Sequence, residues 1–438
     1  MSSLNSAKSL SIVAEKISPD FQISSVLTRF QEKAFLFQTV SGSSIQVAGN
    51  LLSTRDKVEL GIGIPRGQLL DSLESSLRNP TPKGHVPNFK KSDWNYSGEA
   101  DLSRLPILRH FDHEAGKYIT AGIVAARFPG TDRENLSFHR MLVLSKNKVA
   151  ARIVPRHLNQ IAKDSGGRVP ISVIIGPPPE VFVAGSLQVQ FGLSEYDIAN
   201  SLSGGRLKLA SSELTGIAVP EDSEIVLEGY IDFHELTDEG PFVDLTGTYD
   251  EIRRQPVITF ERMHMASEPI YQAVVASTRE HSLFMGLPQE LKIRDVLSKA
   301  IPKIRGINLT PAGSGYFHCI VSIEKTGDGD GKTAIVNCFA ASHPLKLVIA
   351  VDSDVDPFDL LEVEWALSTR FQAATGIVEI DGARGSSLDP SSAKTGVTSK
   401  LGLDATLPIN QDRKKFERAK ITETPQIKLL LDNLEKKF

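Results

Sequence analysis

Residues 238–247 read DEGPFVDLTG and place two carboxylates, Glu239 and Asp244, on either side of a Gly-Pro-Phe turn. Two carboxylates held close together cannot both ionise cheaply, so one keeps its proton near neutral pH and can act as a general acid. Pro241 restricts the backbone there, and Gly240 permits a close approach of the chain. Acids on turns commonly serve solubility alone. The stretch therefore poses a choice between an acid–base pair and surface charge.

Three further stretches carry polar side chains that could act together with this pair. They read ENLSFHR over residues 134–140, RIVPRHLNQIA over 152–162 and LSEYDIA over 193–199. Taken singly, such residues favour structural roles, since a strand arginine such as Arg140 usually pairs with an acid. Asn135 and Arg140 also pose a geometric problem, because an odd spacing on a strand sends two side chains to opposite faces. Either the chain bends between them, or they approach a shared site from different sides.

The composition bounds the class of protein. A chain of 438 residues exceeds one small core, so we expect two or three domains. A net charge of -4 gives no electrostatic footprint for nucleic acid or an anionic membrane. Two cysteines, Cys319 and Cys338, exclude a disulfide framework and fit a reducing compartment. The first residues are polar, and no apolar run reaches the length of a membrane span, so we expect a cytoplasmic protein.

The hydrophobic pattern divides the chain into segments. Residues 1–104 mix short helical and strand patterns, with Thr54 as the expected cap of a helix in TRDKVELGIGI. Short strands broken by glycine and proline dominate residues 105–305 and favour a barrel or a sandwich. Residues 306–420 alternate strand and helix, which predicts an α/β unit.

Residues 421–438 predict a final helix that starts at Pro425. Helical spacing places one apolar face on Ile427, Leu430, Leu431, Leu434 and Phe438. This face packs either on its own domain or on a partner subunit, and the pattern does not choose between them.

Two stretches resemble known ligand loops but depart from them. KTGDGDGKTA ends like a phosphate-binding loop at residues 331–333, but Thr326 stands where the motif requires its first glycine. We expect a Gly/Asp-rich loop that opens a helix. VDSDVDPFDLLEVE spaces its aspartates as a calcium loop does, but Pro357 and Val363 occupy positions that need glycine and glutamate. We expect these acids to end a strand and cap the next helix.

Taken in their order along the chain, the polar stretches resemble the UbiD-like decarboxylases, which use prenylated FMN. The resemblance includes FLFQTVSG, VAGNLLSTRD, RLPILRHF, GKYITAGIV, VPEDSEIVLEGYI, EGPFVDLTGTYDE, EPIYQA, LVIAVDSDVD, VEWALSTR, GSSLDPS and SKLGLDAT. The EGPF segment, followed two residues later by an acid and then by TG, is its most specific piece. The resemblance implies an α/β (α+β) fold, with a central split β-barrel that binds the flavin and a C-terminal α/β domain for oligomerisation.

The resemblance also implies metal and cofactor ligands. Asn135, His157 and Glu195 match the family's metal ligands, which would join Mn2+, or alternatively Mg2+, to the cofactor phosphate, with K+ nearby. Hard oxygen ligands with one imidazole suit manganese. Lys400 would contact the same phosphate. The residues implied to contact the flavin are Phe138, His139, Arg140, Arg152, Ile153, Val154 and His157.

The family's catalytic trio corresponds to Arg140, Glu239 and Asp244. Loss of carbon dioxide leaves an electron pair on carbon, and the prenylated flavin would accept it as an electron sink. We expect Asp244 to donate the replacing proton, while Glu239 and Arg140 form the ionised pair that orients it. An arginine can hold a carboxylate through two parallel hydrogen bonds.

Within the family, the chain looks most like the shorter archaeal-type members, on the evidence of EHSLFMGLPQE, GDGDGKTAIVNCFAASH and ARGSSLDPS. That branch includes decarboxylases of trans-anhydromevalonate phosphate, which form isopentenyl phosphate. The resemblance therefore implies reversible, non-oxidative decarboxylation of an α,β-unsaturated acid that bears a phosphate. Arg262, Arg279 and His281 lie where they could contact that phosphate. The alternatives are a hydroxybenzoate- or furoate-type aromatic acid as substrate, and a non-catalytic binding protein of the same fold.

The resemblance implies partners as well. A flavin prenyltransferase would supply the cofactor. The chain would form a homodimer through its C-terminal unit, or a homohexamer built from such dimers.

Overall fold

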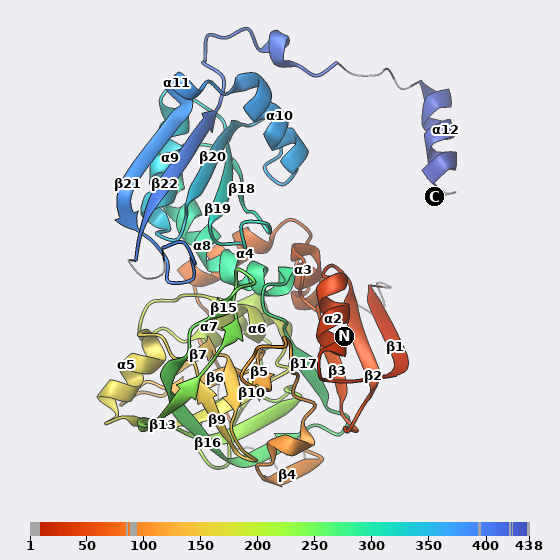
Figure 1. Ribbon diagram of the computed structural model, residues 1–438, viewed down its shortest axis with the longest axis vertical. Helices are drawn as coiled ribbons and strands as arrows, with labels where there is room; N and C mark the ends of the chain where they lie inside the picture. Colours follow the sequence, from red (N-terminus) through yellow and green to blue (C-terminus); the bar gives the residue numbers. More distant parts are fainter. Residues whose placement is uncertain are drawn as a thin grey trace.

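The computed structural model describes residues 9–84, 86–87, 94–392, 396–419, 422 and 424–435. Figure 1 shows an elongated molecule, with the C-terminal unit at one end and the N-terminal and central units at the other. Across these described ranges, no helix combines the length and the apolar character that crossing a membrane requires.

A four-stranded sheet holds the start of the chain. In spatial order its strands are β1 (Leu10–Ile17), β2 (Ala34–Val40), β3 (Gln46–Gly49) and β17 (Ile270–Ala273). The helices of this region are α2 (Gln22–Arg29), α3 (Arg55–Ile62) and α4 (Leu69–Arg78). The predicted start of α3 is confirmed, because the Thr54 side chain accepts a hydrogen bond from the backbone N–H of Lys57.

The central unit is a nine-stranded sheet that curls into a half-barrel (Figure 1). In spatial order its strands are β5 (Tyr118–Ile119), β8 (Met141–Val143), β9 (Lys148–Ala151), β16 (Arg253–Met265), β13 (Ile225–Glu239), β10 (Arg168–Ile175), β6 (Ile123–Arg127) and β7 (Glu134–Phe138), while β4 (Tyr96–Glu99) pairs with β16 off this path. The helices beside it are α5 (His157–Asp164), α6 (Pro179–Ser186) and α7 (Glu195–Leu202). Two small hairpins, β11 (Leu209–Ser211) with β12 (Ala218–Pro220) and β14 (Phe242–Val243) with β15 (Tyr249–Asp250), complete the unit. The predicted split barrel is confirmed.

Apolar side chains cover both faces of this central sheet. Along β10, Ile171, Val173 and Ile175 belong to one core cluster, whereas Ile174 belongs to another. Successive strand residues point to opposite faces, so the run RVPISVII serves two cores at once. Burial of each such side chain stabilises the fold by about 1.5–3 kcal/mol. The middle of the sheet is therefore a rigid support for the loops at its ends.

The C-terminal unit is a five-stranded sheet with helices, which confirms the predicted α/β pattern. In spatial order its strands are β18 (Ile304–Leu309), β19 (His318–Ile323), β20 (Leu347–Asp352), β22 (Val397–Ala405) and β21 (Ile377–Arg384). Its helices are α8 (Arg279–Ala300), α9 (Asp330–Ala341), α10 (Leu360–Arg370) and α11 (Ala373–Gly376). Short 3-10 turns lie at Leu102–Arg104 and Arg413–Phe416.

Strand pairing cuts across the predicted domain boundaries. β4 precedes residue 105 yet pairs with β16 of the central sheet. β17 lies within residues 105–305 yet completes the N-terminal sheet. α8 lies wholly in the same segment and packs on α9 and β18 of the C-terminal unit. The boundaries stay predictions about segments of sequence, because the N-terminal and central sheets each combine strands from two of these segments.

The predicted final helix is present as α12 (Pro425–Glu435), which Figure 1 shows apart from the rest of the chain. Its leucines are exposed, with 56% of Leu430 and 42% of Leu431 accessible. The helix does not pack on its own domain in this structure, and packing on a partner subunit stays a prediction. Phe438, the last residue of the predicted face, lies outside the described residues.

The loop that resembles a phosphate-binding loop opens α9, as predicted. The carboxylate of Asp330 accepts hydrogen bonds from the backbone N–H groups of Thr326 and Gly327. These amides are the donors that a bound phosphate would need. The loop therefore satisfies its own donors and supports no nucleotide site.

The loop that resembles a calcium loop holds a buried ion cluster and a helix cap. Asp359 caps α10 through its side chain, which confirms the predicted role. Asp352, at the end of β20, binds Arg370 and Arg413 at 3.1 Å each, and Arg370 also binds Asp354 at 2.7 Å. The side chains of Asp352 and Arg370 are both 1% exposed.

We expect Arg370→Met to destabilise the protein, because the substitution leaves Asp352 buried with one of its two cationic partners. Breaking a buried ion pair costs about 3–5 kcal/mol, which lowers the thermal midpoint by several degrees. Arg305→Met is the matched control, because Arg305 pairs with Glu324 on the surface. Its loss should lower the free energy of unfolding by less than about 1 kcal/mol. Equal shifts in thermal unfolding for both variants would contradict this account.

Candidate active site

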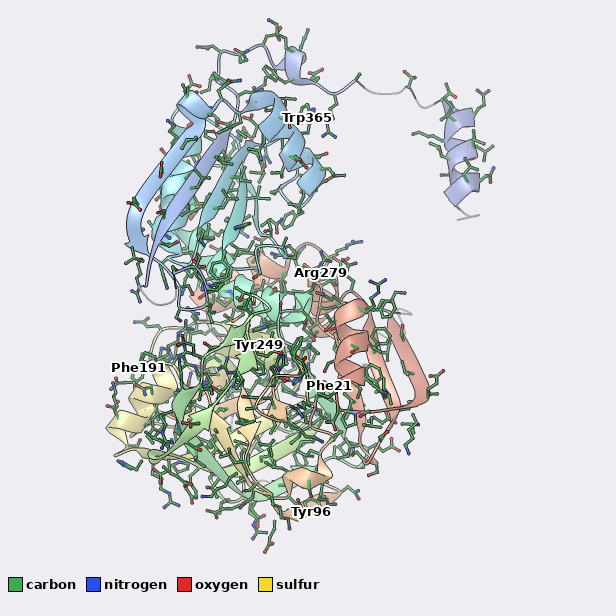
Figure 2. The ribbon with its side chains drawn as sticks, in the orientation of Figure 1. Phe21, Tyr96, Phe191, Tyr249, Arg279 and Trp365 are labelled. Atoms are coloured by element: carbon green, nitrogen blue, oxygen red, sulfur yellow. The ribbon has the colours of Figure 1, made fainter. Side chains whose placement is uncertain are left out.

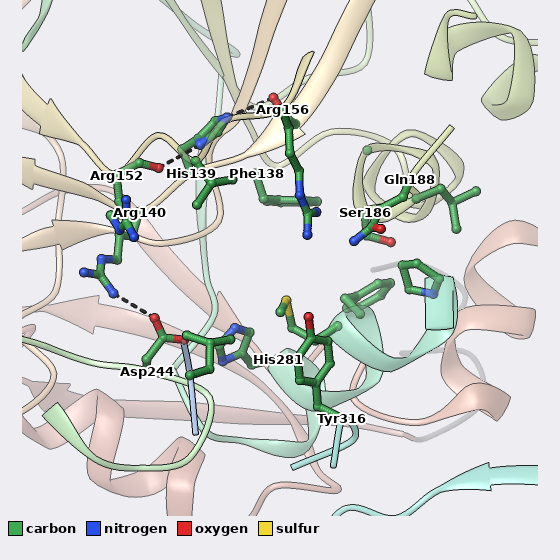
Figure 3. A pocket seen from close by; sticks show the side chains of 18 of the residues that line it. Phe138, His139, Arg140, Arg152, Arg156, Ser186, Gln188, Asp244, His281 and Tyr316 are labelled. Carbon is green, nitrogen blue, oxygen red and sulfur yellow. Dashed lines mark hydrogen bonds and ion pairs between the residues drawn. The ribbon is translucent and has the colours of Figure 1, made fainter. Parts of the chain in front are cut away.

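A cavity of about 1000 Å³ opens between the central sheet and the C-terminal unit. Its walls come from the residues that follow β7 and β9, the first residues of α5 and α7, the end of α6, the β14–β15 hairpin, the first half of α8 and the loop after β21. Figure 3 shows polar side chains from several of these elements pointing into one space. The volume lies at the upper end of the range for small-molecule sites.

Arg140 is the centre of a polar network at one end of this cavity. Its Nε and Nη2 donate to the two carboxylate oxygens of Glu239 at 2.9 and 3.0 Å, and its Nη1 donates to Asp244 Oδ2 at 2.8 Å. Nη2 also donates to Asp250 Oδ2 at 3.0 Å. The Arg140 side chain is 9% exposed, and that of Glu239 is fully buried. The structure thus brings the three predicted catalytic residues together.

The charges of this network compensate one another in a buried setting. Burial alone would lower the pKa of Arg140, but the hydrogen bonds and charge of Glu239, with the charges of Asp244 and Asp250, raise it overall. The guanidinium also lies 4.8 Å from the ring centre of Phe242. Arg140 lies between the two predicted carboxylates, so a shared cation offsets their mutual repulsion. The proton-donor role of Asp244 stays a prediction at this point.

Tyr118 supports the buried end of the network. Its hydroxyl donates to Glu239 Oε1 at 3.2 Å, and the residue is fully buried. Burial raises the pKa of this hydroxyl, and the charge of Glu239 raises it further. Tyr118 therefore stays a neutral donor to the Glu239 carboxyl group.

Asp250 is a third carboxylate of the network, and sequence reasoning missed it. It lies on β15 opposite Phe242 and accepts hydrogen bonds from Arg140 and Arg253. Burial disfavours the charged form of Asp250, but the hydrogen bond from Arg253 and the charges of both arginines outweigh burial and lower its pKa. A signal was present, because the LTG turn between FVD and TYD predicts a hairpin that returns Asp250 to the side of Asp244.

The turn in EGPF depends on Gly240. Its φ is 102°, a backbone conformation that residues with a side chain rarely adopt. A Cβ atom there would lie 3.1 Å from the backbone oxygen of Glu251. The predicted close approach is confirmed, and it places Glu239, at the end of β13, against the hairpin that carries Asp244.

Of the two alternatives for Asn135 and Arg140, the structure shows the bend between them. β7 ends at Phe138 and β8 begins at Met141, so His139 and Arg140 lie in the connection and escape the alternation of the strand. The His139 ring fixes this connection through Ser137 Oγ at 2.9 Å and the backbone oxygen of Arg152 at 3.0 Å. Burial lowers the pKa of His139 to about 4, so its ring is neutral. Asn135 and Arg140 both line the cavity.

The predicted metal ligands Asn135, Glu195 and His157 also line the cavity. The Asn135 amide donates to Glu195 Oε1 at 3.1 Å, while the backbone N–H of Leu136 donates to Glu195 Oε2 at 2.7 Å. Burial raises the pKa of Glu195 to about 8. Burial, with the charge of Arg156, lowers the pKa of His157, so its imidazole is neutral as a metal ligand must be.

A divalent cation fits this set of donors. Asn135 Oδ1 is buried and has no hydrogen-bond partner in the part of the chain that the structure describes. A buried oxygen without a partner is costly unless an ion or water satisfies it. A cation beside it would also favour the ionised form of Glu195. Among the described residues no cluster of three or more His, Cys, Asp or Glu could hold a metal, so a cation here would need the amide oxygen as well as Glu195 and His157.

Most of the residues predicted to contact a flavin line the same cavity. Those that do are Phe138, His139, Arg140, Arg152, Val154 and His157. Ile153 differs, because its side chain belongs to the core and its backbone N–H donates to Gln255 Oε1 at 2.8 Å. An apolar wall from Phe138, which packs 4.7 Å from Phe182, faces the polar residues.

Three other predicted residues do not line the cavity. The Lys400 amine donates to the backbone oxygens of His343 and Leu345 at 2.8 and 2.7 Å, and burial lowers its pKa to about 8. Arg279, which is labelled in Figure 2, instead pairs with Glu32, and Arg262 lies on β16 between β13 and β4. His281 does line the cavity, as predicted. Direct contact of Lys400 with a phosphate stays a prediction, and in this structure its amine holds the backbone next to His343, which lines the cavity.

Comparison with known families and proteins gives a consistent result. The models of the 3-octaprenyl-4-hydroxybenzoate carboxy-lyase (UbiD) N-terminal domain, Rift-related domain and C-terminal domain match residues 1–77, 80–279 and 282–405. The anhydromevalonate phosphate decarboxylase of Methanothermobacter thermautotrophicus is 39% identical over 415 residues, which cover 94% of this chain and 97% of that protein. The enzyme of the same name from Methanosarcina mazei is 39% identical over 417 residues, with 94% and 96% covered.

Solved structures show the same fold. The UbiD-class enzyme HmfF from Pelotomaculum thermopropionicum, in complex with FMN, superposes with a TM-score of 0.93 at 32% identity, covering 98% of this chain and 97% of that one. An evolved dimeric form of HmfF, in complex with prFMN, gives a TM-score of 0.87 at 29% identity, covering 95% of each chain.

The network around Arg140 should contribute to stability as well as to chemistry. We expect Arg140→Met to lower the free energy of unfolding by about 3–5 kcal/mol, because Glu239 stays buried without its cation. Arg140→Lys keeps the charge but loses the paired hydrogen bonds, so its loss should be smaller. Thermal unfolding of the three proteins tests this order. A methionine variant as stable as the parent would show that Glu239 does not depend on Arg140.

Proposed function

This chain belongs to the UbiD family, and on that premise we propose that it removes carbon dioxide, reversibly and without oxidation, from an α,β-unsaturated acid that bears a phosphate. The substrate proposed is trans-anhydromevalonate phosphate, and the product is isopentenyl phosphate. Two relatives named anhydromevalonate phosphate decarboxylase, each 39% identical over 94% of this chain, support this substrate. The observation that carries the proposal is the contact of Arg140 with Asp244 in a cavity that also holds Asn135 and Glu195.

The residues present fit a prenylated FMN with a cation at its phosphate. Phe138, His139, Arg152 and Val154 would contact the ring system, and Asn135, His157 and Glu195 would hold the cation. One imidazole with oxygen donors suits Mn2+ best and Mg2+ next, and K+ nearby is part of the same proposal. When bound, the cofactor supplies the electron sink that no side chain can provide. The HmfF structures with FMN and prFMN support this cofactor.

Asp244 is the better placed of the two predicted acids for proton transfer to the substrate. Glu239 is fully buried, with both oxygens held by Arg140 and one also by Tyr118. Asp244 lines the cavity and its side chain is 21% exposed. Its Oδ1 accepts from the backbone N–H of Leu245 at 2.7 Å, and its Oδ2 accepts from Arg140, so its orientation is fixed. Asp244 is therefore the acid placed to deliver the proton that replaces carbon dioxide, while Arg140 and Glu239 fix its position.

The neighbouring groups make the other cavity-lining acid at this end, Asp250, unsuitable as a proton donor. Arg253 and Arg140 keep Asp250 ionised, so Asp250 orients Arg140 rather than donating a proton. The centre of the Phe242 ring lies 4.8 Å from the guanidinium. This arrangement leaves Asp244 as the proton donor that the network presents to the substrate carbon.

The same proposal includes the oligomeric state of the enzyme and the source of its cofactor. The dimeric form of HmfF supports a homodimer for this chain, and a homohexamer would be built from such dimers. A flavin prenyltransferase would deliver the cofactor.

The direct test is to co-express the chain with a flavin prenyltransferase and to measure bound mass and absorbance. Protein that carries prenylated FMN and Mn2+ and releases carbon dioxide from anhydromevalonate phosphate would support the proposal. A furoate- or hydroxybenzoate-type acid serves as comparator. Turnover of that aromatic acid alone would replace the substrate proposed here. Protein that takes up neither cofactor nor metal would favour a non-catalytic binding protein of the same fold.

We expect Asp244→Asn to reduce turnover by about 10²–10⁴-fold, because an amide cannot deliver the proton. The variant should keep its flavin spectrum, since the predicted flavin contacts lie on other elements. Glu251→Gln is the matched control, because Glu251 is a neighbouring acid with a 72% exposed side chain. Full activity of Asp244→Asn in a carbon dioxide release assay would refute the assignment of the proton donor.

We expect Glu195→Gln to weaken Mn2+ binding by about 10–100-fold, because a neutral amide replaces an anionic ligand. Metal analysis of purified protein, by mass spectrometry of bound ions, measures this directly. Glu180→Gln, a change of the same kind on α6, should leave metal content unchanged. Equal metal content in all three proteins would place the cation elsewhere.

A further inference from the structure

The cavity holds more positive charge than its acids can balance. Six arginine and lysine side chains line it, against three carboxylates, those of Glu195, Asp244 and Asp250. Asp244 and Asp250 are engaged by Arg140 and Arg253. Arg156, Lys292 and Arg384 have no carboxylate within ion-pair distance among the residues that the structure describes. An excess of cations in a cavity predicts an anionic ligand.

Arg156 is one of these three cations and lines the cavity. It precedes α5, and Figure 3 shows it facing Tyr316 across the space, with the Arg140–Asp244 pair to one side. Burial raises the pKa of Tyr316, and the nearby charge of Arg156 opposes that rise. The Tyr316 hydroxyl can donate a hydrogen bond to a ligand that lies between the two side chains.

Lys292 and Arg384 extend the positive region toward the C-terminal unit. Burial lowers the pKa of Lys292, and the charge of Arg156 lowers it further. Burial also lowers the pKa of His343, together with the charges of Arg384, Lys400, Lys292 and Arg156. Cations from α8, from the end of β21 and from the start of α5 therefore lie close enough to act on one another.

We propose that Arg156, with the Tyr316 hydroxyl, binds the phosphate ester of the substrate and selects phosphorylated over unphosphorylated acids. Lys292 and Arg384 add positive potential at the rim of this subsite. The inference rests on the proposed function. It assigns the selection of a phosphorylated substrate to residues that differ from those suggested by sequence. Arg262 and Arg279 lie outside the cavity lining, so they are replaced by Arg156 in that role.

One ligand can span the cavity from Asp244 at one end to Arg156 and Tyr316 at the other, because each end suits a different group of the substrate. An acid whose reacting carbon lies beside Asp244 extends into the space between Arg156 and Tyr316. A phosphate dianion takes paired hydrogen bonds from a guanidinium and a further one from a phenol. The phosphate of the cofactor is a competing occupant, but its proposed cation site at Asn135 and Glu195 already supplies it with a counter-charge.

The test compares two acids on the cofactor-loaded enzyme: anhydromevalonate phosphate and its dephosphorylated form. In Arg156→Gln we expect KM for the phosphorylated acid to rise about 10–100-fold, with kcat changed far less. The dephosphorylated acid should be turned over as by the parent, so the preference between the two acids collapses. Arg156→Lys should keep part of the preference for the phosphorylated acid. Arg66→Gln, which removes a surface arginine paired with Asp56, is the matched control.

Two further measurements keep the inference falsifiable. Calorimetry with isopentenyl phosphate reports binding without turnover, and Tyr316→Phe should weaken it by removing one donor. Flavin absorbance reports whether cofactor is retained. Unchanged preference in Arg156→Gln, or loss of flavin instead of preference, would overturn the assignment of Arg156 while leaving the proposed function intact. A parent enzyme that shows no preference for the phosphorylated acid would overturn both.

Discussion

The buried guanidinium of Arg140 is the constraint on which the active-site region depends. It contacts Glu239 at the end of β13, Asp244 after β14 and Asp250 on β15. A cation with 9% exposure is tolerated only where nearby acids satisfy it, and each of these acids is held by its own hydrogen bonds. The hairpin, the long strand and the bend after β7 therefore fix one another through a single side chain. The cavity owes its shape at this end to charge pairing as much as to apolar packing.

Arg253 allows this network to hold a third carboxylate, that of Asp250, because it compensates the charge of that acid. Without Arg253, Asp250 would add an uncompensated charge next to Glu239 and Asp244. With it, Asp250 is ionised and fixes the second amino group of Arg140. The result is a guanidinium whose nitrogens are all engaged, so its plane cannot rotate toward the ligand. Asp244, the partly exposed member, is then presented to the cavity in one orientation.

The sequence predicted most of the fold and of the site, and the misses share a physical cause. Arg140, Glu239, Asp244, Asn135 and Glu195 were grouped through the resemblance to a family, since residues so far apart along the chain show no local sign of their convergence. Asp250 required a hairpin to be recognised across the LTG turn. Lys400 and Arg279 have side chains whose directions depend on distant partners, His343 and Glu32, which no local pattern reveals. The crossing of β4 and β17 between sheets was missed for the same reason, since strand pairing between distant segments leaves no periodic signal.

The N-terminal sheet has a consequence for how the protein is made. Its fourth strand, β17, pairs with β3, although more than half of the chain's length separates them. During translation the free edge of β3 stays open until residues 270–273 leave the ribosome. An open strand edge invites pairing with other chains, so the nascent protein needs protection until late in its synthesis. Because β17 leads directly into α8, the closing of that edge also delivers the helix that carries His281 and Lys292 to the cavity.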